Sequence, residues 1–163
     1  MLTVVASVCI DQVATVLARE AFAVGISLVL SPVCDLRGPC SAIGSRAFSP
    51  NAQIVADCVE TFIEVAQREG VDCAAKHWPG HGSATADSHK ELPKWFDFSS
   101  RKTDLKKFEQ EQMKPFRSAI RKGVSAILVG HIDVMPWEPS GAQAKPATVS
   151  SAVVSRLREE QFW

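Results

Sequence analysis

The chain has 163 residues, of which 46% are apolar and 22% are charged, and this length and composition suit one globular domain with a buried core. Lys plus Arg and Asp plus Glu balance at 18 each. This zero net charge argues against a general binder of nucleic acid or of membrane surfaces, which would carry a basic excess. The first ten residues are apolar, but they lack a basic region and meet Asp11 too soon for a signal peptide or a membrane span.

The cysteine pattern favours free thiols. The chain has five cysteines, an odd number, and no two of them form a CxxC pair. Neither a disulfide framework nor a zinc site is therefore indicated. We expect buried free thiols in a reducing compartment, and a cytoplasmic protein. The cysteines are Cys9, Cys34, Cys40, Cys58 and Cys73.

The first half of the chain predicts two helices and a strand between them. Apolar residues at helical spacing predict a core-facing helix over 3–24, with Val13 and Val16 among the core positions, and an apolar run at 26–30 predicts a buried strand. Asp35 follows in a loop rich in Gly and Pro. Ser49 is the expected N-cap of the next helix, because Pro50 suits a first turn. The expected apolar face of this helix is Ile54, Cys58, Phe62 and Ala66.

The second half continues the alternation. Residues 71–75 predict a second strand, and a polar loop follows. Thr103 is the expected cap of a third helix, in which Pro115 should cause a break or a kink. Residues 124–129 predict a third strand that ends next to His131, and residues 148–158 predict a last amphipathic helix.

Helices and fully apolar strands in strict alternation predict a parallel sheet covered by helices. The unusual residues come directly after the strands: Asp35, the segment 76–89, and His131. Such clustering is typical of (β/α) barrels and doubly wound sheets, and no GxGxxG sequence supports dinucleotide binding. Since an eight-stranded barrel takes about 200 to 250 residues, the predicted fold is α/β, a partial TIM-like barrel with roughly half of the units.

The segment KHWPGHGSATADSH, residues 76–89, contains three of the four histidines. A polar loop whose histidines cap backbone groups is one interpretation. A metal site is less favoured, because Pro79 and Gly80 prevent the helix that the HxxxH spacing would need. Acid/base chemistry is the third: Asp87 can accept a hydrogen bond from one nitrogen of the imidazole of His89, which leaves the other nitrogen as a proton carrier. The glycines would let such a loop move over a ligand.

The same segment closely resembles the KHFPGHG…DSH…LP signature of glycoside hydrolase family 3, in its bacterial β-N-acetylglucosaminidase branch. Four other segments resemble the family's motifs, and all five occur in the family's order over about residues 21–162. They are SLVLSPVCDL, IGSRAFSP, MKPFRSAIRKGVSAILVGHI and KPATVSSAVVSRLRE. β-Glucosidases of the family usually lack the PGHG and DSH elements, so the resemblance favours the hexosaminidase branch.

The resemblance implies that residues 1–163 are an internal fragment of one TIM-like catalytic domain. It implies hydrolysis of N-acetylglucosamine-containing β-glycosides, such as peptidoglycan fragments, with retention of configuration and without a cofactor. The family's acid/base histidine and its aspartate partner match His89 and Asp87. Its sugar-binding positions match Asp35, Arg46, Lys76 and His77, and His131 lies in a matching strand-end element as a further pocket candidate.

One departure from the family's pattern concerns the nucleophile. The family's nucleophilic aspartate follows a strand beyond the last matching helix, and the sequence does not contain it; Asp133 follows the wrong strand. We therefore expect the chain alone to be inactive or nearly so. A non-catalytic carbohydrate-binding remnant stays open as an alternative, as does a family member of altered specificity, either a β-glucosidase or a glycoside phosphorylase.

Overall fold

The computed structural model describes residues 2–97 and 104–160. Its helices and strands follow the predicted order. Three single turns of 3-10 helix lie in the loops, at Gly44–Arg46, Met135–Trp137 and Ala147–Val149. The main elements are α1 (Leu2–Ala23), β1 (Leu28–Val29), α2 (Ala52–Arg68), β2 (Asp72–Trp78), α3 (Leu105–Arg121), β3 (Ala126–Val129) and α4 (Ser151–Glu160).

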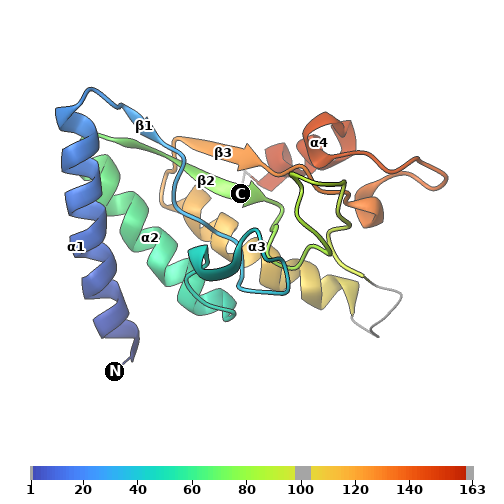
Figure 1. Ribbon diagram of the computed structural model, residues 1–163, viewed down its shortest axis with the longest axis horizontal. Helices are drawn as coiled ribbons and strands as arrows, with labels where there is room; N and C mark the ends of the chain where they lie inside the picture. Colours follow the sequence, from blue (N-terminus) through green and yellow to red (C-terminus); the bar gives the residue numbers. More distant parts are fainter. Residues whose placement is uncertain (1, 98–103, 161–163) are drawn as a thin grey trace.

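The strands form one parallel sheet in the order β1-β2-β3. Helices α1, α2 and α3 lie side by side along the sheet (Figure 1), with α2 packed against both of the others. Because parallel strands all end at the same edge, the loops that follow β1, β2 and β3 meet there. The predicted α/β architecture is confirmed, and the polar segments singled out in the sequence lie at one end of the sheet.

Helix α2 begins two residues later than expected. Asn51, not Ser49, is its N-cap: the side-chain oxygen of Asn51 accepts the backbone N–H groups of Gln53 and Ile54 at 2.9 and 3.2 Å. Ser49 instead accepts the N–H of Asn51. Ile54 is exposed, because the buried face is turned slightly from the expected one. The buried residues are Val55, Ala56, Cys58, Val59, Phe62, Ile63, Val65 and Ala66.

Of the break or kink expected at Pro115, the break is wrong. Helix α3 runs without interruption from Leu105 to Arg121, and Pro115 is buried within it. Flanking side chains Met113 and Phe116 are buried in the core, and this packing offsets the hydrogen bond that a proline cannot make. Asp104 caps the helix by accepting the N–H of Lys106, and the predicted cap Thr103 lies outside the described residues.

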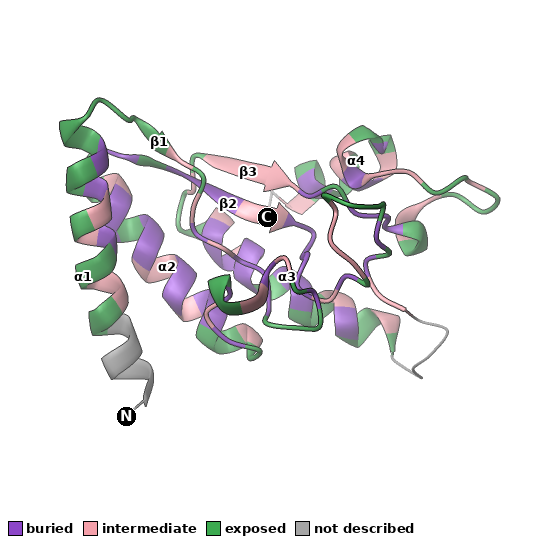
Figure 2. Ribbon diagram, viewed as in Figure 1, coloured by how far each residue is buried: buried purple, intermediate pink, exposed green. Residues whose placement is uncertain are grey.

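Helix α1 packs on only part of the expected face. Ala14, Ala18 and Ala21 are buried, whereas Val16 is 57% exposed and Val13 is equally open to solvent. Small side chains let α1 approach α2 closely, and this close contact decides which face is buried. Strand β1 is also shorter than expected and its apolar residues are partly exposed (Figure 2). An apolar groove runs between α1 and β1.

Strand β2 is longer than predicted and continues to Trp78, so Lys76 and His77 belong to the strand. Its pairing with β3 is irregular at that end, between Lys76 and Trp78. The buried residues of the molecule gather along β2, α2 and the inner side of α3 (Figure 2). The last helix begins at Ser151, three residues after the predicted start, because a 3-10 turn precedes it.

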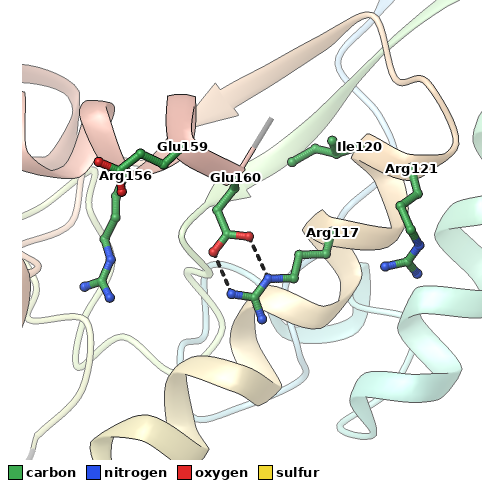
Figure 3. A pocket seen from close by; sticks show the side chains of 6 residues that line it. All are labelled: Arg117, Ile120, Arg121, Arg156, Glu159 and Glu160. Atoms are coloured by element: carbon green, nitrogen blue, oxygen red, sulfur yellow. Dashed lines mark hydrogen bonds and ion pairs between the residues drawn. The ribbon is translucent and has the colours of Figure 1, made fainter. Parts of the chain in front are cut away.

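Helix α4 is joined to α3 by charged side chains. Arg117 of α3 donates two hydrogen bonds of 2.6 Å to the carboxylate of Glu160 of α4 (Figure 3). A cavity of about 490 Å³ lies beside this pair, and three arginines line it. Each of these arginines pairs with a carboxylate, so we interpret the cavity as part of the packing between helices and not as a ligand site. The partners are Glu160 for Arg117, Glu60 for Arg121 and Glu109 for Arg156. None of the helices in the described ranges is long and apolar enough to cross a membrane.

Candidate active site

A small cavity of about 180 Å³ opens where β2 and β3 end. Four of the seven site residues predicted from the sequence line it: Arg46, His77, His89 and His131. Of the other three, Asp35 and Asp87 accept hydrogen bonds from lining histidines, and Lys76 precedes His77 in β2. The remaining lining residues are Ala42, Ile43, His81, Ser88, Leu128, Val129 and Gly130.

Asp35 is fully buried beneath His77. Its Oδ2 atom accepts a hydrogen bond of 2.7 Å from Nδ1 of His77. Its Oδ1 atom accepts the backbone N–H groups of His77 at 3.3 Å and His81 at 2.6 Å. The bond to Nδ1 fixes the tautomer of His77 and leaves Nε2 as the ring nitrogen available to a ligand in the cavity.

Lys76 and Arg46 bring two basic side chains to this end of the sheet. Lys76 is half buried, and burial lowers the pKa of its amine, with a smaller lowering from the nearby charge of Arg46 and an opposing effect from Asp35. Arg46 is exposed at the end of its 3-10 turn, where Nε donates to the carbonyl of Ala42 at 3.1 Å. Donor groups of this kind suit the hydroxyl and carbonyl oxygens of a polar ligand.

The hydrogen bond expected between Asp87 and His89 is present. Oδ1 of Asp87 accepts both the backbone N–H of His89 at 2.9 Å and its Nδ1 at 2.8 Å. These two bonds, the backbone one first, lower the pKa of the Asp87 carboxyl. The imidazole side chain is 83% exposed, whereas that of Asp87 is 22% exposed. The ring is thus held by one nitrogen and presents the other, Nε2, to solvent and to the cavity.

Two glycines let the loops after β1 and β2 touch. A Cβ atom on Gly82 would lie 1.7 Å from the carbonyl oxygen of Leu36, and one on Gly38 would lie 2.3 Å from the carbonyl oxygen of Gly82. The N–H of Cys40 donates to that same Gly82 oxygen at 3.2 Å. Only glycine permits this backbone approach. It fixes the loop that contains Asp35 against the loop that contains Asp87 and His89, which we call the dyad.

The sequence singled out His81 only within the disfavoured HxxxH spacing and the polar-loop interpretation, and the structure places it as a buried histidine beneath Asp87 and His89. His81 is 3% exposed; its Nε2 lies 2.9 Å from Oγ of Ser88 and its Nδ1 lies 3.3 Å from Sγ of Cys40. Burial lowers the pKa of His81, so its imidazole is neutral at neutral pH. Cys40 is 41 residues away in the chain, and no local spacing indicates such a pair.

The other buried groups do not form a metal site or a reactive thiol. Among the described residues no three His, Cys, Asp or Glu side chains gather as metal ligands would. The five cysteines are unpaired; four are buried, as expected, and Cys9 is exposed. Burial raises the pKa values of Cys34 and Cys58, and it raises that of Cys73 to about 12, so these thiols stay protonated.

Comparison with known proteins identifies the family. Residues 3–161 match the model of the glycosyl hydrolase family 3 N-terminal domain. The chain belongs to this family. A β-hexosaminidase of Actinobacillus pleuropneumoniae serotype 5b (strain L20) is 37% identical over 122 residues, which are 74% of this chain and 34% of that protein. A β-hexosaminidase of Xanthomonas oryzae pv. oryzae (strain MAFF 311018) is 34% identical over 131 residues, 78% of this chain and 37% of that protein.

Solved structures of family 3 proteins share the fold. NagZ from Neisseria gonorrhoeae in complex with N-trifluoroacetyl-D-glucosamine superposes with a TM-score of 0.76 at 33% identity, over 89% of this chain and 39% of that one. A family 3 β-N-acetylglucosaminidase from Paenibacillus sp. str. FPU-7 gives a TM-score of 0.83 at 30% identity, over 96% and 29%. The chain spans about a third of the length of the curated relatives it matches. Its three-stranded sheet is part of a barrel fold.

For a family 3 domain, the chemistry of this cavity is well defined. It offers imidazole and guanidinium donors to oxygen atoms, and one imidazole that can carry a proton. None of the described residues that line it is an aspartate or a glutamate. The cavity can therefore hold a hydroxyl-rich ligand and move a proton, but it presents no carboxylate that could attack the ligand.

Proposed function

We propose that this family 3 segment, as part of one catalytic domain, carries the sugar-binding and proton-transfer half of a retaining β-N-acetylglucosaminidase active site. His89 is the general acid/base, and Asp87 holds its tautomer. The terminal sugar binds to Arg46, His77 and His131 in the cavity, with Lys76 as a further contact, and buried Asp35 acts on the sugar through His77, whose ring it holds. The observation that carries this proposal is the bond of 2.8 Å from His89 Nδ1 to Asp87 beside a cavity lined by His77 and Arg46.

The two chemical steps give His89 opposite tasks. In the first, cationic His89 donates the proton on Nε2 to the glycosidic oxygen. The bond between that oxygen and the anomeric carbon breaks as a carboxylate from the rest of the catalytic domain bonds to that carbon. In the second, neutral His89 accepts a proton from the water that attacks the anomeric carbon and displaces that carboxylate. The lowered pKa of the Asp87 carboxyl keeps it ionised, and its negative charge stabilises the imidazolium form.

The relatives support an N-acetylated sugar as the substrate. The curated ones are named β-hexosaminidases, and one solved structure holds N-trifluoroacetyl-D-glucosamine. We infer that His77 and Arg46 donate to the oxygens of a terminal N-acetylglucosamine, with peptidoglycan fragments or related β-glycosides as the source. His77 is the more selective donor, because the buried carboxylate of Asp35 fixes its orientation.

A retaining mechanism needs a second carboxylate about 5 Å from the acid/base group. Since no described lining residue supplies one, we expect the chain alone to bind the sugar without turning it over. The same observation favours a second candidate function, a carbohydrate-binding remnant that uses the cavity only to hold a ligand. A purified chain that releases 4-nitrophenol from the N-acetyl-β-glucosaminide, with the release abolished by His89→Ala, would contradict the expected lack of turnover.

The binding half of the proposal is tested by calorimetry with N-acetylglucosamine. We expect millimolar binding that weakens about tenfold in His77→Ala, the loss of one hydrogen bond from a fixed donor. Arg121→Gln, which lies away from the cavity, serves as the matched control and should bind as the parent does. A folded chain that does not bind, or that binds equally in His77→Ala, would overturn the site assignment. Equal affinity for glucose would point to the β-glucosidase alternative.

A further inference from the structure

Two buried side chains contact the loop of the dyad at the residues on either side of Asp87. Sγ of Cys40 lies 3.4 Å from the carbonyl oxygen of Ala86, and Nε2 of His81 lies 2.9 Å from Oγ of Ser88. Cys40 and His81 also contact each other, at 3.3 Å, and both are almost fully buried. Together with the two loop residues they form a closed chain of polar contacts under the dyad.

The number of protons fixes the direction of these bonds. A thiol has one proton, and a neutral imidazole has one donor and one acceptor nitrogen. If the thiol of Cys40 donates to the carbonyl of Ala86, its sulfur must accept from Nδ1 of His81. Nε2 of His81 is then an acceptor, and the hydroxyl of Ser88 donates to it. Each group in the set is satisfied once, which is what a buried polar cluster requires.

The dyad has few other ties to the rest of the molecule. His89 bonds to Asp87, and the N–H groups of Lys90 and Glu91 bond to the carbonyl of Asp87, all within the same turn. Among the hydrogen bonds that join residues 86–91 to other described segments, the partners are Cys40 and His81. Where the dyad sits relative to the cavity thus depends on these two buried side chains.

We propose that His81 and Cys40 form an anchor that positions the Asp87–His89 dyad over the cavity, with Ser88 as its attachment point. The proposal rests on the proposed function of the dyad and adds positioning residues to it. The anchor also reaches the sugar-binding side, because the N–H of His81 donates to Oδ1 of Asp35 at 2.6 Å while Oδ2 of the same carboxylate holds His77. One buried carboxylate therefore sets the relative places of the proton carrier and of the sugar donor.

Cys40 supplies its own reporter. It is 2% exposed beneath the loop, so a thiol reagent reaches it only when residues 86–91 lift away. The experiment follows modification by N-ethylmaleimide, with each cysteine quantified by peptide mass spectrometry. Ser88→Ala removes the attachment hydroxyl without touching Cys40, and we expect modification of Cys40 to be about fivefold faster, the effect of losing one hydrogen bond on a local opening. Ser88→Thr keeps a hydroxyl and should restore the parent rate.

Matched controls separate the anchor from general loosening. Ser83→Ala removes a bond of the same loop, to the carbonyl of Trp95, and should leave Cys40 at the parent rate. Buried Cys34 and Cys58 should react equally slowly in all variants, and exposed Cys9 equally fast. An unchanged rate at Cys40 in Ser88→Ala, or equal acceleration at Cys34 and Cys58, would overturn the anchor. The readout needs neither sugar nor turnover, so failure of the anchor and failure of the proposed function give different results.

Discussion

The carboxylate of Asp87 accepts two N–H groups from one residue, His89, and this local arrangement sets its titration. Because the folded-state pKa of Asp87 is lowered, the stabilisation from these bonds is complete above the ordinary carboxyl pKa of about 3.9 and is lost as pH falls through the lowered value. In His89→Ala the backbone N–H remains and the imidazole bond is lost, so we expect the pKa of Asp87 to rise part of the way toward its ordinary value.

Carbon-13 NMR titration of the Asp87 carboxyl measures this change directly. His131→Ala is the matched control, since it removes another exposed histidine of the cavity that makes no bond to Asp87. The pKa of Asp87 should be the same in His131→Ala as in the parent. If the pKa of Asp87 were unchanged in His89→Ala as well, the hydrogen bond from the imidazole would not contribute to lowering that pKa.

At the scale of residues, what could be predicted depended on distance along the chain. The bond between Asp87 and His89 was predictable because the two are two residues apart and a turn brings them together. The role of His81 was not predictable, because its partner Cys40 comes from another loop. The contact exists only because Gly38 and Gly82 let the two loops touch, and no local pattern shows that a glycine faces another backbone rather than a turn.

The contact between the loops after β1 and β2 makes a prediction for Gly82. An added methyl group would meet the carbonyl oxygen of Leu36, so Gly82→Ala must push the loops apart. We expect it to lower the free energy of unfolding by about 3 kcal/mol, the upper end of the usual cost of overpacking. We also expect it to abolish binding of N-acetylglucosamine. Denaturant unfolding and calorimetry measure the two effects.

Gly141→Ala is the matched control for this substitution. Gly141 has a left-handed backbone with φ of 82° but no heavy atom within 4 Å of an added Cβ. Alanine there should lower the free energy of unfolding by about 1 kcal/mol, the cost of a left-handed conformation for a residue with a Cβ atom. Sugar binding should be retained. Intact binding in Gly82→Ala would mean that the loops accommodate the methyl group and that their close approach is not needed for the site.

At the scale of elements, the sequence pattern predicted that helices α1 and α3 exist but not how they pack. Their existence was predictable from periodicity, but the buried face of α1 was not, because both alanines and valines recur at helical spacing. Contact with α2 selects the alanines, and that choice depends on the neighbour's shape. Pro115 was misjudged for a related reason: local propensity disfavours it within a helix, and tertiary packing around Met113 and Phe116 overrides the local cost.

At the scale of the molecule, the alternation of helices and strands predicted the parallel sheet and the edge where the site lies. It did not predict how α4 is attached, because that depends on single side chains of α3 and α4. Arg117 and Glu160 form a two-pronged ion pair with both distances at 2.6 Å, partly shielded from water. Arg121 and Glu60 form a longer, single-contact ion pair, at 3.3 Å, between more exposed side chains.

These two pairs allow a matched test of what holds α4 to the rest of the molecule. In a double-mutant cycle of Arg117→Met and Glu160→Gln, we expect a coupling energy of about 1 kcal/mol, the upper end for pairs near the surface, because the geometry is bidentate. The cycle of Arg121→Met and Glu60→Gln should give a coupling well below that. Both couplings are obtained from denaturant unfolding at low salt, and the first should shrink in 1 M NaCl, where charges near the surface are screened. Equal couplings for the two pairs would mean that the bidentate geometry of Arg117 and Glu160 adds nothing to the attachment of α4.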